Sequence, residues 1–323
     1  MIYTALPATR QRNPPFYLAM EEHIARRFPP ADYFFMWQVQ PSVIFGRNQL
    51  IDSEVDTAYC RSHGIGMYRR KSGGGCVYAD MGNIMLSYIT SGESVGFTYN
   101  KYVTLLLSAL RQIGITATVS GRNDVMIDGK KVSGTAFYHL PGRSIVHGTM
   151  LFDTDISNMQ NALTPSSDKL KSKGVSSIRQ RITTIRSHSG ITISDFKAAL
   201  RKFLCDEEMT LTAKDAHSID LIEREYITDA FIYGNNPRYN VTRKGRIDNV
   251  GDFVISLEMK DNVIKSIDIK GDFFIVGDMQ ATIIKPLTNV PLECDALGQA
   301  LPDNLSDTIT NLDKDSFLNI LLS

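Results

Sequence analysis

A cationic, glycine-rich segment carries the residue types in this sequence that could do chemistry. It reads Arg69-Arg70-Lys71-Ser72-Gly73-Gly74-Gly75-Cys76-Val77. Arginine and lysine attract anions, and glycine lets a backbone adopt positive φ and bring its N–H groups close to a ligand. These properties predict a loop that binds a phosphate or a carboxylate. The alternative is a solvated turn beside a basic edge, because a glycine-rich match alone is weakly specific.

A second segment, residues 123–136, supplies a candidate catalytic lysine. It reads NDVMIDGKKVSGTA, and Asp128-Gly129 between two alternating runs predicts a β-hairpin. The turn places Lys131 early on the returning strand, with Lys130 facing the opposite side. Lys131 is either a solvated lysine, as most lysines are, or a held point charge that binds a carboxylate and stabilises an attacked phosphate.

Three other polar residues have both structural and functional interpretations. Cys76 could be a nucleophile beside the cations, but we favour a small buried apolar residue because no histidine lies near it in the sequence. Asp124 is either a structural carboxylate at the turn or a ligand of magnesium or of a hydroxyl. His147 is interpreted as a satisfied core histidine, although Gly148 beside it allows close backbone approach.

Strands and helices must position these residues. The glycines lie between alternating apolar runs, so they connect strands of a sheet rather than domains. Periodic apolar positions predict helices elsewhere. The predicted strands are 34–39, 42–45, 65–68, 77–78, 83–89 and 144–152, and the predicted helices are 14–28, 52–60, 100–113 and 192–205.

The chain length of 323 residues predicts a large domain with a smaller companion. Beyond about residue 246 the pattern changes to short antiparallel strands, over 251–259 and 263–269, followed by helices near 291–300 and 305–322. We therefore predict a linker within 235–247. It would separate a catalytic domain, residues 1–240, from a small α+β domain, residues 246–323.

Composition and missing motifs exclude several classes of protein. Lys+Arg and Asp+Glu are both 35, so no nucleic-acid or membrane partner is expected. The four cysteines show no zinc-ligand spacing, and the apolar runs are shorter than the ~20 residues of a membrane span. The start of the chain lacks the pattern of a signal peptide, so a cytoplasmic location is expected. P-loop, dinucleotide-binding, HExxH and GxSxG motifs do not occur.

Four segments in order resemble the lipoate–protein ligases. They are RRKSGGGCVYADMGNIMLSYI (69–89), GRNDVMIDGKKVSGTAF (121–137), HGTMLFDTDI (147–156) and KSKGVSSIRQRITTI (171–185). The resemblance covers residues 15–205, and the remaining tail has the size of the small accessory domain of longer bacterial members. The GRGRxGRxW loop of the related biotin ligases is missing. Cys76 and Tyr78 depart from the Ala and Phe of many relatives, a change that backbone contacts should tolerate.

The resemblance implies an α+β fold of the biotin/lipoyl ligase group, with mixed β-sheets flanked by helices and a small C-terminal α+β domain. It implies that ATP, with Mg²⁺, activates lipoate to lipoyl-AMP. The lipoyl group then passes to a lysine of a lipoyl-carrier domain, in the E2 subunit of a 2-oxoacid dehydrogenase or in the glycine-cleavage H protein. A mobile loop within residues 160–180 is expected to close over the mixed anhydride.

The resemblance also assigns roles residue by residue. Lys131 would contact both the lipoyl carbonyl and the phosphate, and Arg70 would meet the nucleotide phosphates. The nucleotide would be lined by Gly75, Cys76, Val77, Tyr78, Asn123 and Asp124, with Asp124 as the possible magnesium ligand. The lipoate site would include Gly73, Gly74 and His147.

Two other functions remain open from the sequence. An ATP-independent octanoyl or lipoyl transferase of this scaffold would form a thioester on a cysteine downstream of the lysine segment. Residues 132–204 contain no cysteine, and Cys205 falls in a predicted helix, which argues against a transferase. The third possibility is a module that binds lipoate or its carriers without catalysis, which would not need Arg70 and Lys131 to cradle a phosphate.

Overall fold

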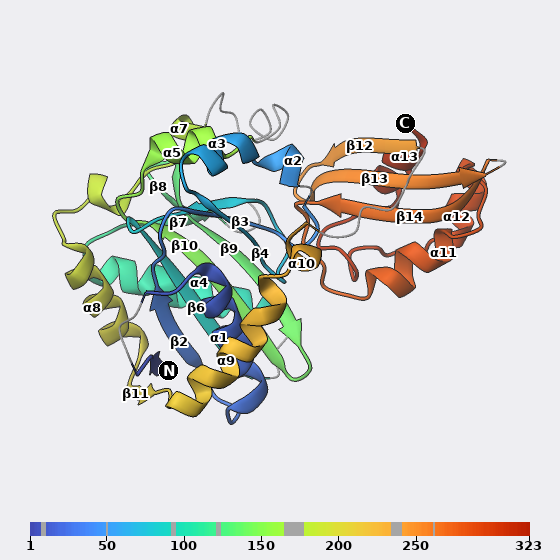
Figure 1. The fold of residues 1–323 in the computed structure, drawn as a ribbon. Coiled ribbons are helices and arrows are strands. Elements are labelled where there is room, and N and C mark those ends of the chain that lie inside the picture. The colour runs from blue at the N-terminus through green and yellow to red at the C-terminus, as the bar shows by residue number, and fades with distance from the viewer. Residues whose placement is uncertain are drawn as a thin grey trace.

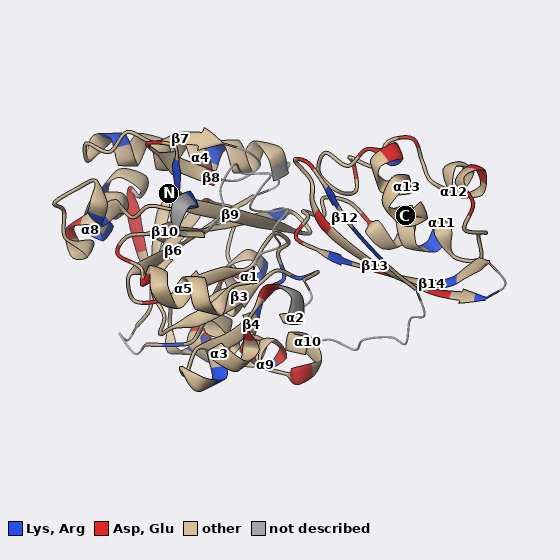
Figure 2. Ribbon diagram, turned by 90° about the horizontal axis from the view of Figure 1, so that it is seen from above, with Lys and Arg blue, Asp and Glu red and all other residues tan. Residues whose placement is uncertain are grey.

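A computed structural model of the chain describes residues 1–7, 11–49, 51–91, 95–120, 124–164, 178–233, 241–260 and 262–323. The molecule has an N-terminal part, residues 1–233, and a smaller C-terminal part, residues 241–323 (Figure 1). Basic and acidic residues are distributed over both parts (Figure 2). None of the helices in the described ranges combines the length and the apolar composition that a membrane span requires.

An eight-stranded mixed sheet forms the centre of the N-terminal part, in the order β11-β1-β2-β6-β10-β9-β8-β7. β1 pairs in parallel with β11 and β2, and the remaining neighbours are antiparallel. The strands are β1 (Ile2–Ala5), β2 (Tyr33–Trp37), β6 (Asn83–Ser91), β7 (Thr118–Ser120), β8 (Asp124–Ile127), β9 (Lys130–Leu140), β10 (Arg143–Leu151) and β11 (Glu207–Thr210).

Helices cover both faces of this sheet (Figure 1). β6 shows the consequence of pleating, because Ile84, Leu86 and Tyr88 enter the core on the side of α4 (Val95–Gln112) and α8 (Ile193–Leu204). The alternate residues Met85 and Ile89 pack on the side of α1 (Pro14–Arg27) and α9 (Ala213–Tyr226). The predicted architecture of mixed sheets flanked by helices is therefore confirmed.

A three-stranded sheet, in the order β4-β3-β5, holds the glycine-rich segment. Its strands are β3 (Ser42–Phe45), β4 (Gly66–Arg69) and β5 (Val77–Ala79). β3 runs parallel to β4 and antiparallel to β5, so residues 70–76 connect the two outer strands across β3. The prediction that the glycines connect strands is correct. We call residues 72–76 the glycine loop.

Short helical elements complete the N-terminal part. They are α2 (Ile51–Glu54), α3 (Thr57–Ser62), α5 (Ile156–Ala162), α7 (Ile178–Arg181), a 3-10 turn (Ile185–Ser187) and α10 (Asp229–Tyr233). Among them, α3, α5 and α10 pack against this second sheet. The loop closure expected within 160–180 falls largely on residues 165–177, which lie outside the described residues.

The C-terminal part has its own apolar core and an antiparallel sheet, β12 (Val241–Ile247), β13 (Gly251–Lys260) and β14 (Val263–Gly271). The helical elements that follow are a π-helical turn (Gln280–Ile284), α11 (Lys285–Leu287), α12 (Cys294–Ala300) and α13 (Lys314–Leu322). Residues 241–247, predicted as linker, pair along their length with β13. Gly245 lets α13 pack against this strand, because a Cβ there would collide with Ile320 of α13. We therefore propose that the small domain begins with β12.

Candidate active site

Two cavities adjoin at the glycine loop and share part of their lining. The shared residues are Cys76, Val77, Lys131, Thr149 and Arg181. The first cavity is otherwise lined by apolar side chains, Leu18, Trp37, Ile44, Met85 and Ala136, and by polar groups that include Arg70 and His147. The second is lined mainly by Tyr78, Leu151, Met159, Leu163, Ile178 and Ile182, with Glu54 at its wall.

Lys131 lies where the two cavities meet, on β9. Its Nζ is 2.7 Å from Asp124 Oδ1, and Arg181 Nη2 donates to Asp124 Oδ2 at 2.7 Å. The chain after α7 is joined to β9 at this point, since the Thr183 N–H donates to the Lys131 carbonyl at 2.8 Å. Arg181 thus reaches a carboxylate 57 residues away in the sequence. The sequence interpretation did not single out Arg181.

Gly134 provides the space in which the Lys131 ammonium lies. A Cβ added at Gly134 would be 2.6 Å from Lys131 Nζ and 2.9 Å from its Cε. Both distances are well below ordinary van der Waals contact. The KVSG spacing therefore has a steric cause, because the lysine folds back over the glycine three residues later.

The Asp124 carboxylate is buried between two cations. Burial alone would raise the pKa of Asp124, but the charges and hydrogen bonds of Lys131 and Arg181 outweigh it and hold this pKa well below the usual range. Asp124 is therefore ionised, and each of its oxygens faces a cation. Among the described residues, no group of three or more His, Cys, Asp or Glu could hold a metal ion. The cation at each of its oxygens makes Asp124 a poor fit to the centre of a protein-held magnesium site.

Arg70 supports the glycine loop from within. Its guanidinium donates to the carbonyls of Gly73 and Gly75 at 2.7 and 2.8 Å, to the Ile44 carbonyl at 2.9 Å, and to Ser72 Oγ at 2.9 Å. Burial lowers the pKa of Arg70 to about 10, so it stays charged at neutral pH. Arg70 lines the first cavity, and its contact with nucleotide phosphates stays a prediction.

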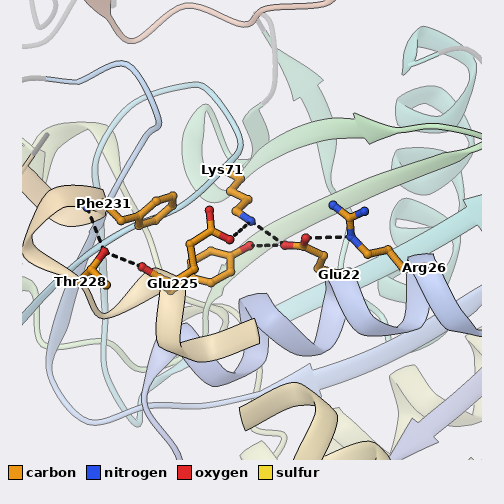
Figure 3. A network of polar contacts seen from close by, with 7 residues as sticks. Glu22, Arg26, Lys71, Glu225, Thr228 and Phe231 are labelled. Carbon is orange, nitrogen blue, oxygen red and sulfur yellow. Dashed lines mark hydrogen bonds and ion pairs between the residues drawn. The ribbon is translucent and has the colours of Figure 1, made fainter. Parts of the chain in front are cut away.

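The neighbouring cations also bind protein groups. Arg69 is buried and donates to the carbonyls of Gly46, Arg47, Gln49 and Ile232. Lys71 bridges Glu22 and Glu225 at 2.9 and 2.8 Å, which ties the start of the loop to α1 and α9 (Figure 3). The cations that the sequence suggested for anion binding therefore serve largely to anchor the loop. Lys131 and Arg181 are the cations that line both cavities.

His147 belongs to a buried polar chain below the loop. Its Nε2 is 2.7 Å from Ser72 Oγ, and its Nδ1 is 2.9 Å from Glu21 Oε2 on α1. Glu21 also accepts from Ser87 Oγ, which in turn accepts from Trp37 Nε1 at 2.9 Å. His147 is thus a satisfied buried histidine that also lines the first cavity. Glu21 lies 126 residues from His147 in the sequence, and no motif pointed to it.

The C-terminal part also contacts the glycine loop. The Gly74 N–H donates to the Phe273 carbonyl at 3.2 Å, and the ring of Phe274 stacks on Phe137 with centroids 4.8 Å apart. Arg246 and Asp272 line the first cavity. The sequence had assigned no site residue to this part of the chain, because no local motif marks either residue.

The remaining predicted residues fall around the two cavities. Gly74 and Gly75 line the first cavity, Tyr78 lines the second, and Cys76 and Val77 line both. Gly74 adopts a positive φ of 84°, as a glycine in a binding loop can. Gly73 is absent from the described lining of both cavities, and a Cβ there would meet the Phe273 carbonyl. Asn123 lies outside the described residues.

Two family descriptions match the chain in succession. The lipoyl protein ligase A/B catalytic domain matches residues 13–204, and the bacterial lipoate protein ligase C-terminus matches residues 236–321. The lipoate-protein ligase LplJ of Bacillus subtilis (strain 168) is 35% identical over 322 residues, covering 96% of this chain and 97% of its own. Lipoate–protein ligase 1 of Staphylococcus aureus (strain Mu50) is 35% identical over 276 residues, covering 83% and 84%.

Solved structures share the fold. P. falciparum LipL1 in complex with lipoate has a TM-score of 0.77 at 18% identity, covering 100% of this chain and 98% of its own. A lipoate-protein ligase A bound with ATP has a TM-score of 0.63 at 25% identity, covering 72% and 99%. The bi-partite ligase of Thermoplasma acidophilum, described with its E2 lipoyl domain, has a TM-score of 0.64 at 27% identity, covering 74% and 98%. By its sequence relatives and both matched descriptions, the chain belongs to the lipoate–protein ligases.

Proposed function

We propose that this chain joins lipoate to AMP with ATP and then transfers the lipoyl group to a lysine of a lipoyl-carrier domain. The observation that carries the proposal is the pair of cavities that share Lys131. The first, which joins apolar side chains to Gly74 and His147, suits an acid with an aliphatic chain. The second is assigned to the nucleotide because its wall includes Tyr78, which the family resemblance places at the adenylate. Their common wall is where a carboxylate and an α-phosphate would meet.

The first step brings two anions together. A carboxylate oxygen attacks the α-phosphorus, the bond to the bridging oxygen breaks, and pyrophosphate leaves. Lys131 and Arg181 offset the repulsion and stabilise the negative charge that develops on the phosphate. Confinement of both reactants against one wall supplies a large further part of the rate. Mg²⁺ would enter with the ATP phosphates rather than on a protein-held site, since both oxygens of Asp124 already face cations.

The glycine loop would present backbone donors to the adenylate. In a trans peptide, the C=O and the N–H that follows it point to opposite sides. Because Arg70 binds the carbonyls of Gly73 and Gly75, the N–H groups of Gly74 and Cys76 point away from Arg70, and that of Gly74 donates to the Phe273 carbonyl. The assignment of Cys76, Val77 and Tyr78 to nucleotide contacts through the backbone is supported by their places in the two cavities.

The second step consumes the mixed anhydride. The amine of a carrier lysine attacks the acyl carbonyl, AMP leaves, and the amine loses a proton. The carrier is proposed to be a lipoyl domain of an E2 subunit, because a similar ligase is described with its E2 lipoyl domain. The glycine-cleavage H protein would carry the same kind of lysine. We propose a cytoplasmic site for the reaction.

Mass spectrometry of a carrier domain tests this function. The carrier, incubated with the chain, lipoate, ATP and magnesium, should gain one lipoyl group, and omission of ATP should prevent the gain. A gain without ATP from an acyl-carrier donor would instead favour the transferase. Lys131→Ala should abolish pyrophosphate release. Lys130→Ala is the matched control, because Lys130 is exposed on the same strand. Normal pyrophosphate release by Lys131→Ala would refute the role of this lysine.

A further inference from the structure

Glu21 and Glu22 are consecutive residues of α1, and both side chains are buried. Glutamates are almost never fully buried unless they are paired. Glu22 faces the ammonium of Lys71 at 2.9 Å, whereas the hydrogen bonds of Glu21 come from Ser87 and His147. A carboxylate at 0% exposure is costly unless its partners compensate for the lost water, so the position of Glu21 requires a reason.

The hydrogen bonds around Glu21 select one tautomer of His147. An ionised carboxylate only accepts, so His147 Nδ1, 2.9 Å from Glu21 Oε2, carries the proton. Nε2 of the neutral ring then accepts from the hydroxyl of Ser72 at 2.7 Å. Ser72 Oγ in turn accepts from Arg70 Nε at 2.9 Å. With Glu21 ionised and His147 neutral, each donor in this series of hydrogen bonds has an acceptor.

This series of hydrogen bonds ends on the glycine loop. Arg70, which Ser72 orients, binds the carbonyls of Gly73 and Gly75. These bonds turn the following N–H groups outward. The Gly74 N–H shows this orientation directly, because it reaches the Phe273 carbonyl. The proton on His147 therefore influences which way the loop amides point.

We propose that Glu21 is a positioning residue of the glycine loop. It fixes the tautomer of His147, which fixes the hydroxyl of Ser72 and, through it, the grip of Arg70 on the loop carbonyls. The inference rests on the proposed function, because the loop acts here as a wall of the acid and nucleotide cavities. It assigns to α1 a part in the activation step that no loop motif indicates.

The substitution Glu21→Gln changes the acceptor pattern while preserving side-chain size. Ser87 donates to Oε1, so the amide oxygen of glutamine takes that place, and the new NH₂ group takes the place of Oε2, which is the oxygen nearer to His147 Nδ1 (2.9 Å, against 3.1 Å for Oε1). The NH₂ group and the Nδ1–H of His147 would then be two donors that face each other. The proton of His147 therefore moves from Nδ1 to Nε2. Ser72 must now accept from both His147 and Arg70, and its own hydroxyl hydrogen loses its acceptor. A displacement of the loop by about 1 Å would lower the rate by about 10²-fold.

Two measurements test the proposal. Nitrogen-15 NMR of histidine-labelled protein distinguishes the two ring tautomers, and His147→Asn identifies the signal. The wild type should show the Nδ1–H form, and Glu21→Gln the Nε2–H form. Lipoate-dependent ATP–pyrophosphate exchange by Glu21→Gln should fall by about 10²-fold in kcat/KM. Ser72→Ala should show the same loss of exchange while His147 keeps its Nδ1 proton, because Glu21 is intact.

Asp32→Asn is the matched control. Asp32 also accepts from a hydroxyl of β6, that of Thr90, but Thr90 and its other partner, Lys101, lie outside the series of hydrogen bonds that ends on the glycine loop. It should retain wild-type exchange and the wild-type His147 tautomer. The proposal is overturned if Glu21→Gln keeps the Nδ1–H form, or if its exchange equals that of Asp32→Asn. If the wild type itself lacks lipoate-dependent exchange, the proposed function fails, and the tautomer comparison still decides whether Glu21 sets His147.

Discussion

The space at Gly134 gives the most direct test of how Lys131 is held. In Gly134→Ala, the new Cβ would lie 2.6 Å from Lys131 Nζ, where ordinary contact begins at 3.4 Å. The ammonium must therefore retreat by roughly 1 Å, away from the position between the two cavities. A misplacement of this size in a reacting group costs about 10²-fold in rate, which corresponds to about 2.7 kcal/mol in the activation barrier.

The same substitution should leave the fold stable. The atom that must move is the end of a flexible side chain, and Gly134 is not in the positive-φ region. Replacing glycine by alanine at a compatible site stabilises a protein by about 0.4–1 kcal/mol through the unfolded state. We therefore expect a free energy of unfolding within about 1 kcal/mol of the wild type.

ATP–pyrophosphate exchange with lipoate measures the loss of activity, and urea unfolding measures stability. Gly298→Ala in α12 is the matched control, because its Cβ would meet no atom within 4 Å. It should leave exchange unchanged. Wild-type exchange by Gly134→Ala would refute the reasoning, as would a loss of activity that follows a comparable loss of stability.

Three further outcomes are expected. Arg181→Gln should lower ATP–pyrophosphate exchange by about 10²-fold, because one of the two cations at the shared wall is lost. Exchange equal to that of the wild type would show that Arg181 takes no part in the reaction. Despite burial, the neighbouring cations depress the pKa of Asp124, so its contribution to stability should be present above the unfolded pKa of about 3.9 and decline below it. The difference between wild type and Asp124→Asn in urea unfolding should therefore shrink from neutral pH to about pH 3, and a constant difference would contradict this. Burial raises the pKa of Cys60 to about 11, so a thiol reagent should modify exposed Cys294 in the native protein and Cys60 only after unfolding.

Local patterns predicted much of the fold. The Asp128-Gly129 turn forms with positive φ at both residues, and the strands on either side of the glycines appear as β4 and β5. The hairpin of β13 and β14 also follows its alternating pattern. β12 was missed, because a short run containing glycine carries a weak strand signal and its pairing with β13 decides its conformation.

The site was predicted less completely. The structure brings Lys131, Asp124 and His147 to the glycine loop, as the motif order indicated. It also brings Arg181 there, which the fourth segment of the resemblance contained without an assigned role, and Glu21, which no motif marked. The partners of the cationic run could not be read from the sequence: charge attracts anions in general, but Arg69 donates to backbone carbonyls, and Lys71 pairs with the buried Glu22 and the exposed Glu225.

The sequence by itself determined many of the elements and the position of the loop, because turns, strand alternation and glycine freedom depend on neighbouring residues. The tertiary structure decided which charges face the cavities and which hold the loop. That choice depends on contacts between residues far apart in the chain, such as Glu21 with His147 and Asp124 with Arg181. Burial then sets the cost of leaving any of these groups unpaired.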